Sequence, residues 1–292
     1  MKKSTNLNKT IYLGVLILVT MSFDSSGSTK VDLFSGKIGV CTSYAQSGVL
    51  IDNGYSFVEE SVGRFLVPTK DESEFEEILS DAKNHSLPVI ACNSFIPGSL
   101  KSVGPDAVHP EILTYVETAF RRANKAGVEI IVFGSGGSRF IPEEFSRDEA
   151  RAQFIDLCKQ IAPIARENNV TVVLEPLNTQ ECNFINSVAE GGEIVKEVNH
   201  PNFLLLADIY HMKMENESAD NILKYGNLIK HVHIAEKQER AVPGTHDEDF
   251  RPYFNALKKI NYKGRISIEA RWNDFEAQVP VAIKTIMTQV KH

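Results

Sequence analysis

The segment Val170-Thr-Val-Val-Leu-Glu175 is a run of β-branched and aliphatic residues that ends on a carboxylate. Phe203-Leu-Leu-Leu-Ala-Asp208 repeats this arrangement, and two further runs follow it, Ile229-Lys-His-Val-His-Ile234 and Arg265-Ile-Ser-Ile-Glu269. The first two runs lack the polar alternation of a half-exposed strand, as expected of strands buried on both faces of a parallel sheet. The four runs therefore predict parallel strands that carry polar side chains near their carboxyl ends.

Similar runs occur earlier in the chain, which makes eight expected strands: Lys37–Cys41, Ser56–Glu60, Pro88–Cys92, Glu129–Phe133, Val170–Glu175, Phe203–Ala207, Ile229–Ile234 and Arg265–Glu269. Between them, apolar residues spaced three or four apart predict helices over Asp71–His85, Glu111–Ala126, Arg147–Asn168, Ser187–Val198, Asp247–Lys259 and Phe275–Val290. The stretch from the first strand through Asn53 is a shorter helical candidate. Eight βα units predict an α/β protein with a single (β/α)₈ TIM barrel.

The bulk composition agrees with one globular domain. The chain has 292 residues, of which 42% are hydrophobic and 24% are charged, and these are ordinary values for a folded protein. Barrels of this class commonly reach about 250 residues as one unit, so residues 31–292 are interpreted as a single catalytic domain. The formal net charge is -7, which disfavours nucleic acid as a partner because a phosphate backbone demands a basic surface.

Residues 1–30 have the layout of a secretory signal peptide. Three lysines within the first nine residues precede an apolar run over residues 11–19, and small and polar residues follow it. The apolar run is much shorter than the ~20 residues that span a bilayer. We therefore expect export to a bacterial periplasm, with no stable membrane association once the leader is removed. An uncleaved N-terminal membrane anchor is the alternative.

Polar residues at the ends of the last four expected strands are the strongest functional signal. In a (β/α)₈ barrel these ends meet at one face, so four side chains should converge there: Glu175, Asp208, His233 and Glu269. Unpaired buried carboxylates are costly, and a cluster of them is best explained by a bound cation. Their oxygen and nitrogen donors suit Mn²⁺, Mg²⁺, Co²⁺ or Zn²⁺. His233 is preferred to His231 as the ligand because it lies nearer the carboxyl end of its strand.

At these positions the sequence resembles the xylose-isomerase-like sugar isomerase and epimerase superfamily, and within it the ketose 3-epimerases that act on tagatose and psicose. The resemblance covers most of the chain after the leader and is strongest over residues 170–270. It rests on these motif residues: Glu175 with Glu181, Asp208 with His211, His231 and His233 with Glu236 and Arg240, and Glu269 in Ile-x-Ile-Glu. Arg240 lies seven residues after His233, one more than in the family pattern.

The resemblance implies a metal-dependent sugar isomerase or epimerase. One divalent ion, Mn²⁺ first and Mg²⁺, Co²⁺ or Zn²⁺ otherwise, would be held by Glu175, Asp208, His233 and Glu269. Substrate oxygens would be held by Glu181, His211 and Arg240. Glu175 and Glu269 would face opposite sides of the sugar, one removing a proton beside the carbonyl and the other returning it through an enediolate.

Three other functions stay open at this stage. The same enediolate chemistry in an exported protein is compatible with a lyase or hydrolase that acts on 3-keto-glycosides. An apurinic endonuclease uses a related barrel, but here the fourth expected strand ends in Phe-Gly-Ser where that class has a histidine. A metal-free sugar-binding protein is the third alternative. The sugar, the reacting carbon, the metal and a homo-oligomeric state are not decided by the sequence.

Several other residues have two interpretations each. The segment Phe133-Gly-Ser-Gly-Gly-Ser-Arg139 is either a nest of backbone N–H groups for a sugar or phosphate, with Arg139 as a clamp, or a plain glycine-rich turn. Trp272 either walls the pocket or covers the barrel rim. Substrate contact and surface or capping roles are equally compatible with Glu59, Glu60 and Asn93.

Overall fold

The computed structural model describes residues 33–291, together with Met1. The predicted leader over residues 1–30 therefore lies outside the described residues, apart from Met1, and both its export role and the alternative anchor stay predictions. Among the described residues, no helix combines the length and the apolar composition that crossing a membrane requires.

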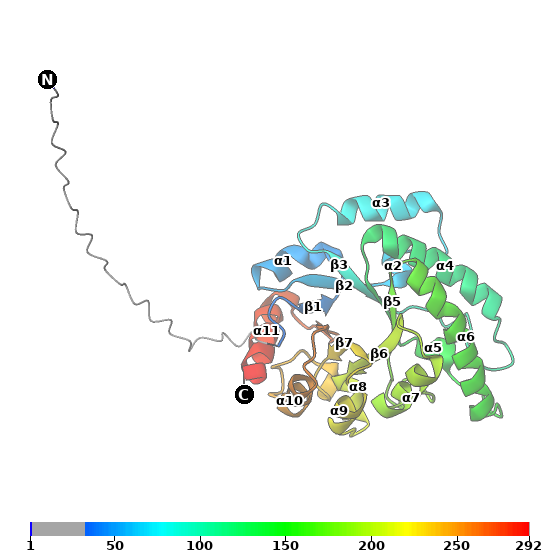
Figure 1. The fold of residues 1–292 in the computed structure, drawn as a ribbon. Helices are drawn as coiled ribbons and strands as arrows, with labels where there is room; N and C mark the ends of the chain where they lie inside the picture. Colours follow the sequence, from blue (N-terminus) through cyan, green and yellow to red (C-terminus); the bar gives the residue numbers. More distant parts are fainter. Residues whose placement is uncertain (2–32, 292) are drawn as a thin grey trace. The chain divides into compact units, whose positions relative to one another are not determined.

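Within residues 33–291, eight parallel strands close into a barrel in chain order (Figure 1). The strands are β1 (Ile38–Cys41), β2 (Phe57–Ser61), β3 (Val89–Asn93), β4 (Ile130–Phe133), β5 (Thr171–Leu174), β6 (Phe203–Asp208), β7 (Ile229–Ile234) and β8 (Arg265–Ile268). Strand β8 pairs back with β1, with Ile38 opposite Ile266. The predicted α/β class and single (β/α)₈ TIM barrel are confirmed.

Helices cover the outside of the barrel, as α4 and α6 show in Figure 1. The longer ones correspond to the six predicted helices: α3 (Glu72–Ala82), α4 (His109–Ala126), α6 (Arg147–Glu167), α7 (Val188–Val198), α10 (Arg251–Lys259) and α11 (Phe275–Lys291). The shorter ones are η1 (Tyr44–Gln46), α1 (Ser47–Asp52), α2 (Val62–Phe65), α5 (Gly136–Arg139), α8 (Ile209–Met214), α9 (Asp220–Tyr225) and η2 (Gln238–Arg240). Most of these are too short to produce a helical period in the sequence.

Helix α10 begins later than the predicted Asp247. The carboxylate of the fully buried Glu236 accepts hydrogen bonds from the backbone N–H groups of Gly244, Thr245 and His246, and so holds this loop in a non-helical form. Asp247 itself has a φ of 55°, in the left-handed region, which interrupts a right-handed helix. The helical pattern therefore continues only from Arg251.

Apolar side chains fill two layers, one on each side of the strands. Inside the barrel there is a small cluster formed by Ala91, Ile130, Val132, Val173 and Leu206. A much larger cluster lies between the strands and the surrounding helices. Successive side chains of a strand point to opposite faces, so alternate residues supply the two layers.

Five phenylalanines form a continuous aromatic row through the outer layer. Phe95 stacks on Phe120 of α4 at a centroid distance of 5.3 Å and meets Phe133 of β4 edge-on at 5.4 Å. Phe154 of α6 then lies 5.2 Å from Phe133 and 5.7 Å from Phe184. All five are fully buried. The row therefore joins β4 to α4 and α6, behind the glycine-rich segment that follows β4.

We expect Phe154→Ala to lower the free energy of unfolding by about 3–5 kcal/mol, because it removes a buried ring and leaves a cavity in this row. The matched control is Phe140→Ala, since the Phe140 side chain is 50% exposed. That change should alter the free energy of unfolding by less than about 0.5 kcal/mol. Urea unfolding followed by circular dichroism measures both variants. Equal losses in the two variants would contradict the packing described here.

Candidate active site

The carboxyl ends of β5 to β8 bring four donor side chains together. Glu175 directly follows β5, Asp208 ends β6, His233 lies in β7 and Glu269 directly follows β8. Donor atoms from these four residues all lie within 4.8 Å of one another. Glu175, Asp208 and His233 are buried, whereas a quarter of the Glu269 side chain is exposed. The structure thus gathers in one place the four residues predicted to hold a metal.

The strand register explains this convergence. Across β6 and β7, Asp208 lies opposite His233, after an irregularity between Leu205 and Leu206. Across β7 and β8, His233 lies opposite Ser267. Glu269 comes two residues after Ser267, and alternate residues of a strand point to the same face. Asp208, His233 and Glu269 are therefore directed toward the barrel axis.

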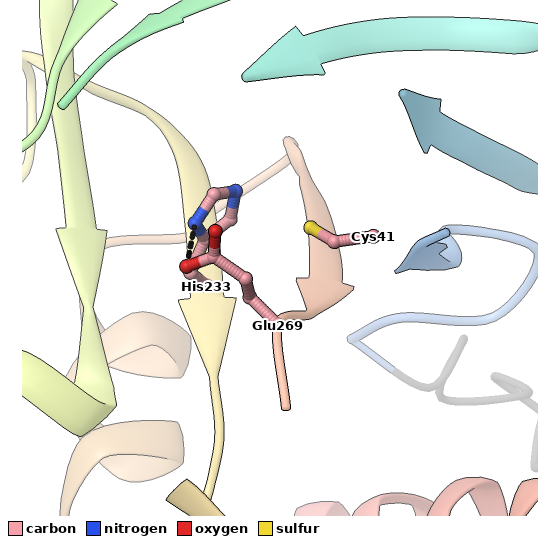
Figure 2. A group of neighbouring side chains, drawn as sticks. All are labelled: Cys41, His233 and Glu269. Carbon is pink, nitrogen blue, oxygen red and sulfur yellow. Dashed lines mark ion pairs between the residues drawn. The ribbon is translucent and has the colours of Figure 1, made fainter. Parts of the chain in front are cut away.

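His233 lies at the centre of the cluster. Its Nδ1 atom is 3.0 Å from Oε1 of Glu175 and 3.4 Å from Oε2 of Glu269. Figure 2 shows Glu269 beside the imidazole, with the thiol of Cys41 directed toward them from β1. On the far side of the ring, Nε2 lies 3.0 Å from Oε1 of Glu59. The imidazole is thus enclosed by carboxylates on both sides.

Burial and charge act in opposite directions on these groups. Burial raises the pKa of Asp208 to about 6, although Arg240 opposes this shift, and burial also raises the pKa of Glu175. Burial acts in the same way on Glu269, but His233 and Arg240 outweigh it and lower its pKa to about 2. Burial alone would lower the pKa of His233, yet the nearby carboxylates, Glu59 foremost, raise it well above its usual value. Glu175, Asp208 and Glu269 are therefore only partly balanced by the positive charges beside them.

The donor set fits a divalent cation. Oδ2 of Asp208 is buried and has no hydrogen-bond partner within the described part of the chain. Three carboxylates and one imidazole nitrogen form an oxygen-rich set that Mn²⁺, Mg²⁺, Co²⁺ and Zn²⁺ accept. A cation would provide both the missing positive charge and a partner for Asp208. These residues therefore form a candidate metal centre.

Arg240 reaches the same site despite its additional residue of spacing. Its guanidinium lies 3.3 Å from Oε1 of Glu181 and forms an ion pair with Glu269. It also lies 4.6 Å from the ring centroid of Tyr210. Glu239 and Arg240 have φ values of 60° and 53°, so two successive residues adopt the left-handed region. This tight turn accommodates the additional residue while the side chain still reaches the strand ends.

His211 lies in α8, one turn beyond Asp208, and is only 3% exposed. Its Nδ1 accepts a hydrogen bond from the backbone N–H of Asn178 at 3.1 Å, so the ring proton is assigned to Nε2. Among the described residues Nε2 has no hydrogen-bond partner, and it lies 3.5 Å from Oδ2 of Asp208. Because burial lowers the pKa of His211, the neutral ring offers one N–H donor.

These side chains line a cavity of about 330 Å³. One side of the cavity is formed by Glu175, Glu181, His211, Arg240 and Glu269. The other side consists of the loops that follow β3 and β4, including residues 93–94, 96–98 and 134–136. Pockets for small ligands typically measure about 300–1,000 Å³, so this cavity suits a small molecule. Because charged side chains line the cavity, it suits a polar small molecule.

Asn93 and Trp272 have different positions relative to this cavity. Asn93 lines it, and its Nδ2 lies 3.5 Å from Oε1 of Glu269, at the limit of a hydrogen bond. Trp272 is not among the lining residues and packs against Phe275 with ring centroids 4.8 Å apart. Of the two interpretations of Trp272, the structure favours a cover on the barrel rim.

Of the two interpretations of residues 133–139, the structure contradicts the one in which Arg139 clamps a ligand. Its side chain is fully buried and donates hydrogen bonds to the backbone carbonyl oxygens of Phe133 and Glu175, at 3.3 Å and 2.7 Å. It therefore holds the main chain at the point where Glu175 enters the site. Gly134 leaves room for the Glu175 carboxylate, because a Cβ atom at position 134 would collide with Oε2 of Glu175.

Glu59 is the residue whose position the sequence analysis missed. Its carboxylate lies inside the barrel and contacts both His231 and His233. Glu60 points elsewhere and accepts a hydrogen bond from the backbone N–H of Tyr44 at 3.0 Å. Two consecutive glutamates in an apolar strand were the available signal, because residues of a strand alternate between its faces and one of the two must point inward.

Comparisons with known proteins agree with this geometry. The chain is 37% identical over 123 residues to an L-ribulose 3-epimerase from Methylomonas sp. (strain DH-1), which covers 42% of this chain and 43% of that protein. It is 31% identical over 223 residues to a D-psicose 3-epimerase from Agrobacterium fabrum, which covers 74% of this chain and 75% of that protein. Among solved structures, the 3-keto-D-glucoside 4-epimerase from E. coli has a TM-score of 0.73 at 22% identity, with 86% of this chain and 99% of that chain covered.

The resemblance inferred from the motif residues is confirmed by these relatives, which are sugar epimerases and hence isomerases. The aligned stretch spans less than half of the L-ribulose 3-epimerase and three quarters of the D-psicose 3-epimerase. A match to the family described as Xylose isomerase-like TIM barrel extends over residues 49–287, and because it covers most of the sequence, this chain belongs to that family.

Proposed function

We propose that this protein is a metal-dependent sugar epimerase that moves a proton on a carbon next to a carbonyl group. The observation that carries the proposal is the pairing of Glu175 and Glu269 around His233, with both carboxylates bordering one polar cavity. Two carboxylates at one pocket allow one to remove a proton and the other to return it. Two of the proteins described above are named as 3-epimerases, which supports the same chemistry here.

The two carboxylates differ in how the chain holds them. Glu269 forms an ion pair with Arg240, and the Nε atom of Arg240 also donates to the backbone carbonyl of Glu269 at 3.2 Å. Arg139 donates a hydrogen bond to the backbone carbonyl of Glu175, and Nδ1 of His233 contacts the Glu175 carboxylate. A bound divalent cation would supply the positive charge that stabilises the enediolate formed when the proton leaves. Glu175 and Glu269, which both line the cavity, would then act as the two proton carriers.

Substrate hydroxyl groups would be bound by the polar wall of the cavity. Arg240 presents donors beside Glu181, and Nε2 of His211 is a buried donor that has no protein hydrogen-bond partner in the described structure. A buried donor without a partner is costly, so a sugar oxygen at this position would be favoured. These three residues therefore supply both donors and acceptors for a polyol.

Mn²⁺ is our first choice of metal, with Mg²⁺, Co²⁺ and Zn²⁺ as the ions to compare. Free ketohexoses are the first substrates to test, and 3-keto-glycosides are the second because the same proton abstraction can also expel a neighbouring group. If the leader directs export, as we propose, unphosphorylated sugars are the relevant class. Release of an aglycone without epimer formation would favour the lyase alternative, and tight sugar binding without proton exchange would favour a binding protein.

We expect Glu175→Gln and Glu269→Gln each to lower turnover by about 10²–10⁴-fold, since each removes one proton carrier. The measurement is deuterium incorporation from D₂O into the substrate by NMR, in the presence of Mn²⁺. Glu117→Gln is the control, because Glu117 is exposed on α4 and away from the cavity. Unchanged exchange in both site variants would contradict the assignment.

Removal of the metal by a chelator should abolish turnover and lower the melting temperature. At a metal concentration of about 100 times Kd, binding contributes roughly 2.7 kcal/mol, which corresponds to about 5–10 °C for a domain of this size. Elemental analysis and differential scanning calorimetry before and after chelation, and after Mn²⁺ is restored, measure this effect. A protein with full turnover and less than about 0.1 equivalents of metal would exclude the proposed role of the cation.

We expect Gly134→Ala to lower kcat by about 10²-fold while the fold is retained, because the new methyl group displaces the Glu175 carboxylate from its position. Gly63→Ala is the matched control, since the nearest atom to a Cβ there lies 3.8 Å away, at ordinary van der Waals distance. Steady-state kinetics and circular dichroism of both variants test this. Equal activity in the two variants would show that Gly134 has no positioning effect.

A further inference from the structure

A second polar cluster lies inside the barrel, next to the four donor residues. Glu59 of β2 is 1% exposed, and three polar side chains surround its carboxylate. The Oγ atom of Ser267 donates to Oε2 at 2.7 Å, and Nε2 of His231 lies 2.9 Å from the same oxygen. Nε2 of His233 lies 3.2 Å from this oxygen, within hydrogen-bond geometry, and 3.0 Å from the other oxygen, Oε1. The proton-transfer scheme above gives Glu59 no role.

The two nitrogens of His233 face different partners. Nδ1 faces Glu175 and Glu269, whereas Nε2 faces Glu59. A neutral imidazole that donates an N–H at Nε2 has its lone pair at Nδ1. In the neutral ring that a bound cation requires, the position of Glu59 therefore selects the form of His233 whose lone pair lies at Nδ1, toward Glu175 and Glu269.

The contacts of Glu59 with His231 and Ser267 restrain the carboxylate itself. Nδ1 of His231 is buried and has no hydrogen-bond partner among the described residues, so His231 is anchored only through Nε2. Ser267 lies opposite His233 in the register of β7 and β8, which places its hydroxyl at the same level of the barrel. A carboxylate that two neighbours hold in place can orient a third group.

We propose that Glu59 is a positioning residue for the metal centre, which holds Nε2 of His233 so that Nδ1 is presented to a divalent cation. This inference rests on the proposed function, because it requires that a cation binds at Glu175, Asp208, His233 and Glu269. Carboxylates that accept the second N–H of a metal-binding histidine fix its orientation and increase its basicity, and their loss typically weakens metal affinity by about 10–100-fold.

Glu60 provides a matched control on the same strand. It is also buried, at 3% exposure, and its carboxylate accepts hydrogen bonds from the backbone N–H groups of Tyr44 and Ser61 at 3.0 Å and 3.1 Å. It also pairs with Arg64, and within the described part of the chain it forms no hydrogen bond or ion pair with His231 or His233. A loss of charge at Glu60 therefore tests general destabilisation of β2 without any effect on the orientation of His233.

The experiment compares Glu59→Gln and Glu60→Gln in the full chain, with Mn²⁺ and Co²⁺ titrated into the metal-free protein by calorimetry. We expect Kd to rise by about 10–100-fold in Glu59→Gln and by less than about threefold in Glu60→Gln. In the Co²⁺ form, the paramagnetically shifted proton on Nε2 of His233 should move or broaden only in Glu59→Gln. Circular dichroism verifies that both variants are folded.

An unchanged Kd in folded Glu59→Gln, or an equal rise in both variants, would overturn this inference and leave the epimerase proposal intact. Failure of the wild-type chain to bind either ion would instead refute the metal-dependent function itself. If Glu59→Gln does not fold, Ser267→Ala is the second variant, because it removes one restraint on Glu59 and leaves the charge in place. It should raise Kd in the same direction by a smaller factor, and an unchanged Kd in that variant would also count against the inference.

Discussion

The structure depends on how buried negative charge is balanced at the carboxyl ends of β5 to β8. Glu175, Asp208 and Glu269 gather around the imidazole of His233. Glu59 contacts the same ring through Nε2 and adds a fourth carboxylate. Burial raises the pKa values of Glu175 and Asp208, whereas His233 and Arg240 outweigh burial at Glu269 and lower its pKa. In the proposed function, a cation would complete this arrangement and balance the buried charge.

Much of the surrounding chain serves to hold these acids in place. Arg139 is fully buried and uses its guanidinium to bind main-chain carbonyls beside Glu175, while Gly134 leaves the space that the carboxylate occupies. The buried Glu236 ties down the loop after β7 through backbone N–H groups. Residues that do not line the cavity thus determine its geometry, and a search for polar side chains at the pocket surface alone would overlook them.

The aromatic residues that stabilise the barrel and the residues of the candidate site lie in different layers. The row of phenylalanines between β4 and the helices lies in the outer layer, whereas the acids and imidazoles lie in the inner layer. Because alternate residues of each strand supply the two layers, a strand such as β7 can place Ile234 in the apolar outer core and His233 in the site. The loops after β3 and β4 also line the cavity, and their lining residues include Gly98, Gly134 and Gly136.

The sequence by itself determined the fold class and the four donor residues, because apolar strand periods and polar strand ends are local signals, and barrel closure then brings those ends to one face. It also indicated that Glu181, His211 and Arg240 lie near one another, through the family motifs. Only the tertiary structure decided the roles of Arg139 and Glu59, since Arg139 binds the carbonyl of Glu175, 36 residues away, and the partners of Glu59 lie 172 to 208 residues away in the chain. The tertiary structure also decided that the Arg240 side chain enters the site, because this depends on a turn in which Glu239 and Arg240 both adopt left-handed backbone conformations. Pairing across distant strands has no signature in the local sequence, because it arises only when the barrel closes.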